Sequence, residues 1–89
     1  MTNEQLKQFD DGDIVDAFVD NYYHLLCMDE SRDLLLFQWC TEIKNILVIE
    51  LQIRDIAFYP LIARATEMHN SNAHLQKIIS KMTKTNDVN

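Results

Sequence analysis

An uninterrupted stretch from Leu34 to Tyr59 dominates this sequence, because it contains neither glycine nor proline and stops at Pro60, the only proline. Apolar residues recur along it at intervals of three, four and seven, which is typical of an amphipathic helix. Such a helix would be roughly 39 Å long at 1.5 Å per residue. We therefore predict one long central helix over about 33–59. Its apolar face would comprise Leu36, Cys40, Ile43, Leu47 and Phe58, widened by Trp39, Ile46, Ile53 and Ala57.

The fold class is predicted from the length of the chain and from its small number of glycine and proline residues. A chain of 89 residues is long enough for one domain, and a single Gly and a single Pro are too few for the tight turns of an all-β fold. We predict an all-α, compact small bundle of about four helices around the long central helix. The whole of 1–89 would be a single helical domain with flexible ends at about 1–10 and 85–89.

The remaining helices are predicted from caps and periodicity. Asp13 would cap a first main helix over about 14–28, and Ser31 would cap the long helix. Pro60 either kinks the long helix or occupies the first turn of a third one, and we favour a break or strong bend at this point. A short helix over 61–69, a turn over 70–72 and a last helix over 73–83 would follow. The last helix would pack on the core through Leu75, Ile78, Ile79 and Met82.

Negative charge is concentrated near the beginning of the chain. The net charge is −6, yet the segment 10–33 alone carries eight acids against one base, Arg32. On a helix, Asp13, Asp16, Asp20 and His24 share one sector. Like charges spaced three or four residues apart repel one another. The sector is either an ordinary solvated surface or a docking surface for a basic partner. The residues of the predicted docking surface are Asp13, Asp16, Asp20, His24, Asp29, Glu30, Asp33 and Tyr23.

Glu50 and Arg54 are charged residues in an apolar sector of the long helix. Buried charges must be paired, because an isolated one costs several kcal/mol. We expect a buried polar pair at the end of the core. Two alternatives are an irregular helix near Pro60 that turns both residues outward, and a surface that faces a partner.

Cys27 and Cys40 are the only cysteines, and both lie among apolar residues. We favour two buried, reduced thiols in a cytoplasmic protein over a disulfide between the first two helices. The polar first residues lack the pattern of a secretion signal. The charges within the long apolar stretch exclude a membrane span.

Catalysis, metals and nucleic acid are disfavoured by the same residues. His24 and Cys27 lie three apart without a glycine-rich turn to form an oxyanion hole. The three histidines, His24, His69 and His74, do not have the i, i+4 spacing of a ligand pair, so we predict no metal and no cofactor. Lysines are too few for phosphate recognition.

Two functional hypotheses follow. The first is a small acidic binding protein, not an enzyme, that neutralises a basic protein by occlusion. Immunity proteins, antitoxins and phage-type inhibitors work in this way, and the target would be a toxin or enzyme such as a nuclease. The alternative is a self-associating structural or regulatory module. It rests on the apolar character of Ile46 to Tyr59 on nearly all sides, and it leaves a homodimer open.

Overall fold

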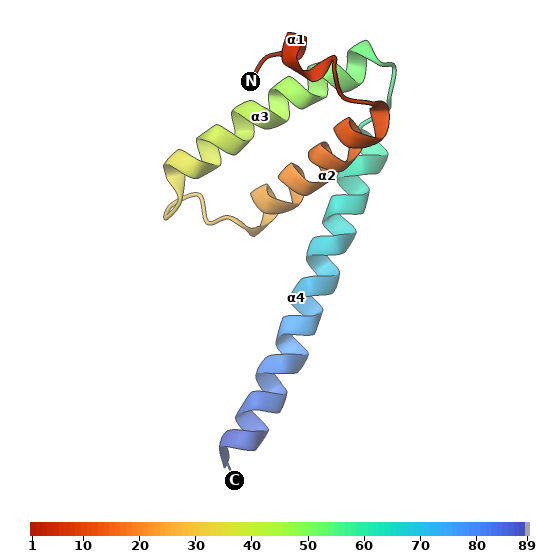
Figure 1. Cartoon of the computed structure of the whole chain (residues 1–89). Coiled ribbons are helices and arrows are strands. Elements are labelled where there is room, and N and C mark those ends of the chain that lie inside the picture. Colours follow the sequence, from red (N-terminus) through yellow and green to blue (C-terminus); the bar gives the residue numbers. More distant parts are fainter. Residues whose placement is uncertain (89) are drawn as a thin grey trace.

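The fold is all-α, as predicted (Figure 1). A computed structural model describes the backbone of residues 1–88 and the side chains of residues 1–82. Within residues 1–88 the chain contains no strand and four helices: α1 (Asn3–Leu6), α2 (Asp11–Cys27), α3 (Leu34–Ile53) and α4 (Tyr59–Val88). Asn89, part of the predicted flexible end at 85–89, lies outside the described residues.

The first ten residues are tied to the bundle, in contrast to the predicted flexible lead. Thr2 and Gln5 form a reciprocal capping box at the start of α1. Each of the two side chains accepts the backbone N–H of the other residue, which satisfies two otherwise unpaired donors. Leu6 then reaches the core and is only 5% exposed. A short helix without a long apolar pattern becomes ordered here because its one leucine is buried.

Helix α2 begins earlier than predicted. Its N-cap is Asp10, whose carboxylate accepts the backbone N–H of Asp13 at 2.8 Å. Asp13 therefore lies inside the first turn and is not the cap. The helix also ends one residue earlier than predicted, at Cys27. Ser31 does not cap α3 either, because it donates to the side chain of Asp29, and the N-cap position belongs to Asp33.

Helix α3 ends at Ile53, six residues before the predicted end at 59. Asp55 adopts a left-handed conformation with φ of 59°. The backbone N–H of Ile56 donates to the carbonyl of Leu51 at 2.9 Å, and that of Asp55 donates to the carbonyl of Gln52 at 3.1 Å. This pair of bonds is the Schellman arrangement that closes many helices. It turns the chain sharply, so that Ile56 and Phe58 pack back against the core.

Pro60 lies in the first turn of α4, which confirms one of the two predicted alternatives, and it does not kink the long helix, because α3 has already ended at Ile53. A proline is well tolerated there, since the first amides of a helix have no partner within it. The predicted helices over 61–69 and 73–83 are one continuous helix, and the predicted turn at 70–72 is absent. Asn and Ser cost only about 0.5 kcal/mol each in a helix interior, which is too little to break a continuing helix.

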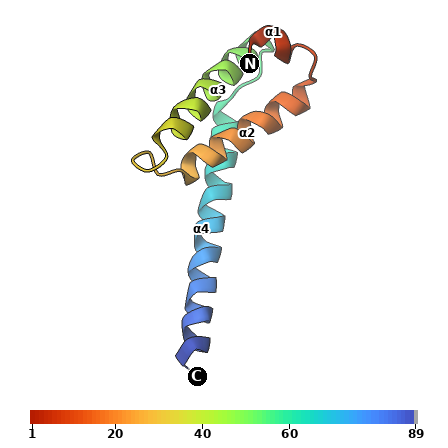
Figure 2. The same cartoon turned by 60° about the vertical axis from the view of Figure 1, so that its left-hand side comes forward.

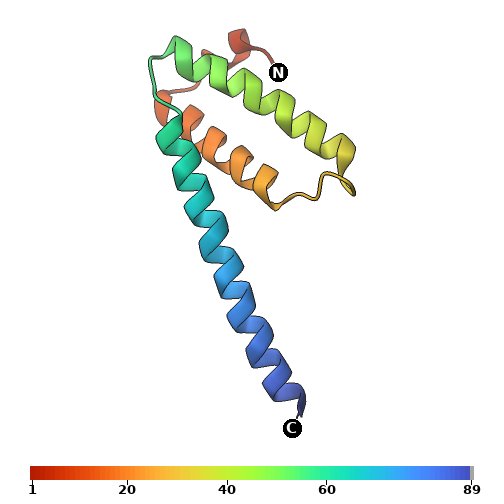
Figure 3. The ribbon, with the colours of Figure 1, turned by 180° about the vertical axis from the view of Figure 1, so that it is seen from behind.

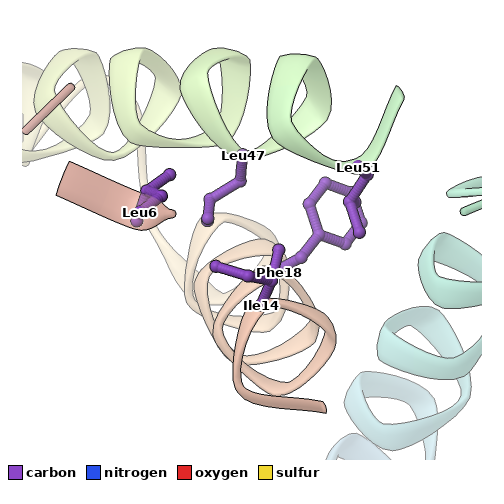
Figure 4. Close-up of a cluster of buried hydrophobic side chains, with 5 residues drawn as sticks. All are labelled: Leu6, Ile14, Phe18, Leu47 and Leu51. Atoms are coloured by element: carbon purple, nitrogen blue, oxygen red, sulfur yellow. The ribbon is translucent and has the colours of Figure 1, made fainter. Parts of the chain in front are cut away.

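The core lies where α1, α2 and α3 meet (Figure 4). Ile14 and Phe18 point from α2 toward Leu47 and Leu51 on α3, with Leu6 beside them. The first turns of α4 pack on the other side of α2, where Ala65 is fully buried and Leu61 and Ile62 extend the cluster. α2 therefore contacts both long neighbours. Cys40 of the predicted α3 face is buried, whereas Leu36, Trp39 and Ile53 are exposed.

The second half of α4 projects away from the bundle (Figures 2 and 3). The molecule measures 58 × 26 × 20 Å, and its radius of gyration is 16.7 Å. A compact domain of this length would have a radius of gyration of about 12 Å. The predicted packing of Leu75, Ile78, Ile79 and Met82 on the core is therefore wrong, since all four are exposed.

Candidate functional site

Asp13, Asp16 and Asp20 form one exposed face of α2, which we call the acidic face. Asp16 and Asp20 lie on the side of the helix away from the buried Phe18, whereas Asp13 also borders an apolar hollow that Ile14 and Leu47 line. In the described part of the chain, no lysine or arginine forms an ion pair with any of the three. Three carboxylates on one helix attract cations, because a positive group relieves their mutual repulsion.

His24 extends the acidic face toward the end of α2. Its Nδ1–H donates to the backbone carbonyl of Asp20 at 2.7 Å and lies 3.7 Å from the carboxylate of the same residue. The histidine is exposed. Among the three aspartates of the acidic face, Asp20 is therefore the one whose carboxylate lies close to a histidine of α2.

A hollow of about 480 Å³ lies beside the acidic face, between α2 and α4. Asp16 and Asp20 form its acidic wall, and Arg64 and Met68 of α4 form the opposite wall. Arg64 is the charged residue of this hollow that sequence reasoning missed. Its proximity to α2 depends on the docking of α4, which no local pattern reveals.

The other acids between 10 and 33 have different roles. Asp10 caps α2, and Asp11 pairs with Arg54 at 2.9 Å. Asp29 accepts hydrogen bonds from the side chain and backbone N–H of Ser31, and these bonds lower the pKa of Asp29. Glu30 and Asp33 are exposed in the link before α3. The predicted docking set thus comprises one ordered face and a separate acidic link.

Tyr23, a member of the predicted docking surface, is half-buried. Its hydroxyl accepts a hydrogen bond from the side chain of Asn72, and its ring lies edge-on to His69 with centroids 6.4 Å apart. Tyr23 therefore fastens α4 to α2, and its ring is partly covered by α4. Tyr59, by contrast, is 75% exposed.

A thiol and an imidazole meet at this junction. Cys27 Sγ lies 3.6 Å from His69 Nδ1, at the edge of a hollow of about 430 Å³ that Tyr23, Asn72 and Gln76 also line. Sequence reasoning paired Cys27 with His24 and missed His69. The pairing could be found only if 70–72 were read as helix, because His69 and Asn72 then share one side of α4. Both cysteines are free thiols, but only Cys40 is buried.

The cluster does not amount to a metal centre. Among the described residues, no group of three or more His, Cys, Asp and Glu side chains comes together. Cys27 and His69 offer two ligands, whereas zinc sites in proteins use three or four protein ligands. His24 and His74 do not join them at the junction hollow.

Glu50 and Arg54 form a polar connection at the end of the core. Glu50 is only 2% exposed, and Arg54 Nε donates to its carboxylate at 2.9 Å. Asn3 Nδ2 donates to the other oxygen of Glu50 at 3.2 Å. The bond from Arg54 is the main cause that lowers the pKa of Glu50, and it outweighs the opposing effect of desolvation. The same bond raises the pKa of Arg54.

The remaining donors of Arg54 fix the beginning of the chain. Its Nη2 donates to the backbone carbonyls of Leu6 at 3.0 Å and Phe9 at 2.8 Å, and its Nη1 to Asp11. One guanidinium thus joins the end of α3 to α1 and to the start of α2. We interpret this cluster as structural, since its polar groups bond to one another and none is left unpaired.

Comparison with protein-family models, curated proteins and solved structures gives no match for this chain. Over the described residues, none of the helices combines the length and the apolarity required to cross a bilayer.

Proposed function

We propose that this chain is a small acidic helical binding protein that docks through the acidic face onto a basic protein partner. The observation that supports this proposal most directly is the exposed row of Asp13, Asp16 and Asp20, which has no lysine or arginine paired with it in the described part of the chain. Helix α2 is held on one side by α3 and on the other by α4. Little conformational entropy is therefore lost when the face binds.

The proposed mechanism is occlusion without catalysis. The carboxylates would occupy lysines and arginines that the partner needs for its own activity. For a nuclease toxin, these would be the residues that bind phosphate. Immunity proteins, antitoxins and phage-type inhibitors in the cytoplasm act in this manner. The segregated charge would accelerate association, and added salt would weaken it by screening.

The test compares two variants that change the net charge equally. One carries Asp13→Asn, Asp16→Asn and Asp20→Asn, and the other carries Glu4→Gln, Glu42→Gln and Glu67→Gln at exposed acids elsewhere. Wild type immobilised on resin is used to capture a partner from the producing cell at low salt. The purified partner is then titrated with all three proteins by calorimetry.

We expect the aspartate triple variant to bind at least about tenfold more weakly at low salt, with a shallower dependence on salt. The glutamate triple variant should stay within about twofold of wild type. Equal loss in both variants would mean that net charge alone is responsible, and undiminished binding by the aspartate variant would refute the acidic face as the docking surface.

A further inference from the structure

The second half of α4 meets the bundle only near its beginning, where Asn72 donates to Tyr23 and Leu75 and Gln76 line the hollow beside Cys27. From Asn70 to Met82 every residue is exposed, and Figures 1 to 3 show this part of the helix extending away from α1, α2 and α3. The segment contains two asparagines and two serines. An isolated helix of this composition is marginal in water, because most helical stability in proteins comes from packing of an apolar face.

An apolar face is nevertheless present on this projecting segment. Leu75, Ile78 and Met82 are 51%, 42% and 61% exposed and, together with Met68, define what we call the α4 stripe. Met68, Leu75 and Met82 are spaced by seven residues, and Ile78 lies three after Leu75. This is the heptad spacing by which one helix packs along another.

A second exposed apolar stripe runs along α3. Leu35, Trp39, Ile49 and Ile53 are 82%, 60%, 48% and 63% exposed, and we call these four residues the α3 stripe. They lie to one side of the core face that Leu47 and Leu51 occupy. Trp39 and Ile53 are fourteen residues apart, or two heptads, and the half-buried Ile46 lies midway between them. The α3 stripe is therefore a docking face of the same kind as the α4 stripe.

The chain exposes more surface than a compact monomer of its mass, and the excess is large enough for an interface with a second copy. The chain exposes 6597 Å². A folded monomer of 10.5 kDa exposes about 5,400 Å², so the excess is about 1,200 Å². Two copies that each buried this excess would form an interface of about 2,400 Å², which is in the range of obligate homodimers. Large exposed apolar stripes of this extent are uncommon on monomers.

We infer that a second copy of this chain covers both stripes, with the α4 stripe of each copy packed along the α3 stripe of the other. The lengths match, since the α3 stripe spans roughly 27 Å and the α4 stripe roughly 21 Å at 1.5 Å per residue. The contact is made twice, as two-fold symmetry requires of a closed dimer.

Charge favours this pairing over one between two α4 helices. Between Asn70 and Met82 the projecting segment carries Lys77 and Lys81 and no acid, whereas the link before α3 carries Asp29, Glu30 and Asp33 against one base, Arg32. Packing α4 beside the start of α3 brings opposite charges together, while packing α4 on α4 brings two positive helices together. The three aspartates of the acidic face belong to neither stripe, although Met68 borders the hollow beside Asp16 and Asp20. The dimer is argued from the stripes alone and does not depend on the proposed function.

Sedimentation of the full chain over a range of concentrations tests the dimer. We expect a dimer for wild type and at least tenfold weaker association for Leu75→Ser/Ile78→Ser and for Leu35→Ser/Trp39→Ser. The control Ala73→Ser/Gln76→Ser changes the same part of α4 at exposed, uncharged residues outside the stripe, and it should remain dimeric. A wild-type chain that is monomeric at all concentrations would overturn the inference, and so would a dimer that persists in both stripe variants.

Chemical cross-linking tests which helices pair, and it uses exposed positions that the fold tolerates. Ile49→Cys and Ile78→Cys are made separately in a Cys27→Ser background, so that Cys40, which is buried, is the only native thiol. The two proteins are mixed and treated with a short bifunctional thiol reagent. We expect coupling between position 49 of one copy and position 78 of the other. Efficient coupling of the Ile78→Cys variant to itself would show that α4 pairs with α4, and would overturn the proposed arrangement.

Discussion

Asp55 sets the end of α3 through its backbone conformation. Its φ of 59° lies in the left-handed region, which costs an ordinary L-residue roughly 1–2 kcal/mol and glycine almost nothing. Aspartate tolerates this region better than most residues because its short side chain bonds locally. The conformation allows the sharp reversal that returns Ile56 to the core.

The stability of variants at Asp55 should therefore depend on how easily the new residue adopts the left-handed backbone conformation, and not on its hydrophobicity. We expect Asp55→Gly to unfold at the same or a higher urea concentration than wild type. Asp55→Val should lose about 2 kcal/mol of unfolding free energy, because a β-branched residue is strained there. Urea denaturation measures both. If the glycine and valine variants were equally stable, the left-handed residue would have no role in closing α3.

Glu50 should make the stability of the folded chain depend on pH in the acidic range. Its hydrogen bond from Arg54 lowers its pKa below the ordinary value of 4.5. The unfolded chain then binds the proton more readily than the folded chain, so stability falls as the pH drops below about 4.5. We expect Glu50→Gln to be less stable than wild type at neutral pH, and this difference to shrink as the pH falls from about 6 to 3.

The control for this measurement is Glu4→Gln, which makes the same chemical change at an exposed ion pair with Lys7. Surface pairs of this kind contribute little. Asp29 contributes to acid sensitivity in both the wild type and the Glu50 variant, so its effect cancels in the difference. A stability difference for Glu50→Gln that does not vary with pH would contradict the assigned role of the carboxylate.

At the scale of the element, α1 shows how a short segment becomes ordered by a few tertiary contacts. It is a four-residue helix held by Leu6 in the core, by the bond from Asn3 to Glu50 and by the bond from Arg54 to the carbonyl of Leu6. None of these contacts is local. The isolated segment would not be helical, because helices this short do not nucleate in water.

Leu6→Ala should accordingly destabilise the whole bundle, although it changes a residue near the chain end. Removal of a buried leucine side chain costs about 2–5 kcal/mol, and Leu6 lies at the edge of the core, so we expect about 2 kcal/mol. Lys7→Ala, on the exposed neighbour, should change stability by less than about 0.5 kcal/mol. Thermal unfolding followed by circular dichroism compares them. If Leu6→Ala left the unfolding temperature unchanged, α1 would not unfold cooperatively with the rest of the bundle.

At the scale of the molecule, the core is small and many apolar side chains, including those of the projecting α4, are left exposed. Eight hydrophobic residues are buried and fourteen large ones are exposed among the described side chains. A chain with more exposed than buried apolar side chains gains additional stability from association.

Helix content should therefore depend on protein concentration. We expect the far-ultraviolet helical signal per residue to fall on dilution, as the projecting half of α4 loses the second copy that covers it. The Leu75→Ser/Ile78→Ser variant should show the lower signal at every concentration. A wild-type signal that stays constant from micromolar to millimolar protein would argue that α4 is helical without any partner.

Local chemistry determined the helical class, the segregation of charge along α2 and the periodic apolar faces. The scarcity of Gly and Pro and the spacing of Asp13, Asp16 and Asp20 act over a few residues, so they can be read from the sequence. The predicted ends of the helices were less successful, because competing local signals differ by well under 1 kcal/mol per residue.

Contacts between distant residues decided the rest. Arg54, Asp11 and the carbonyls near Leu6 help to fix the turn that ends α3, and Tyr23 meets His69 and Asn72 only because α4 runs past α2 without a break. The sequence presents Leu75, Ile78 and Met82 as a core face, and only the direction of α4 leaves them in solvent. Periodicity specifies which residues share a side of a helix. What that side packs against depends on burial summed over the whole chain, and that is a property of the tertiary structure alone.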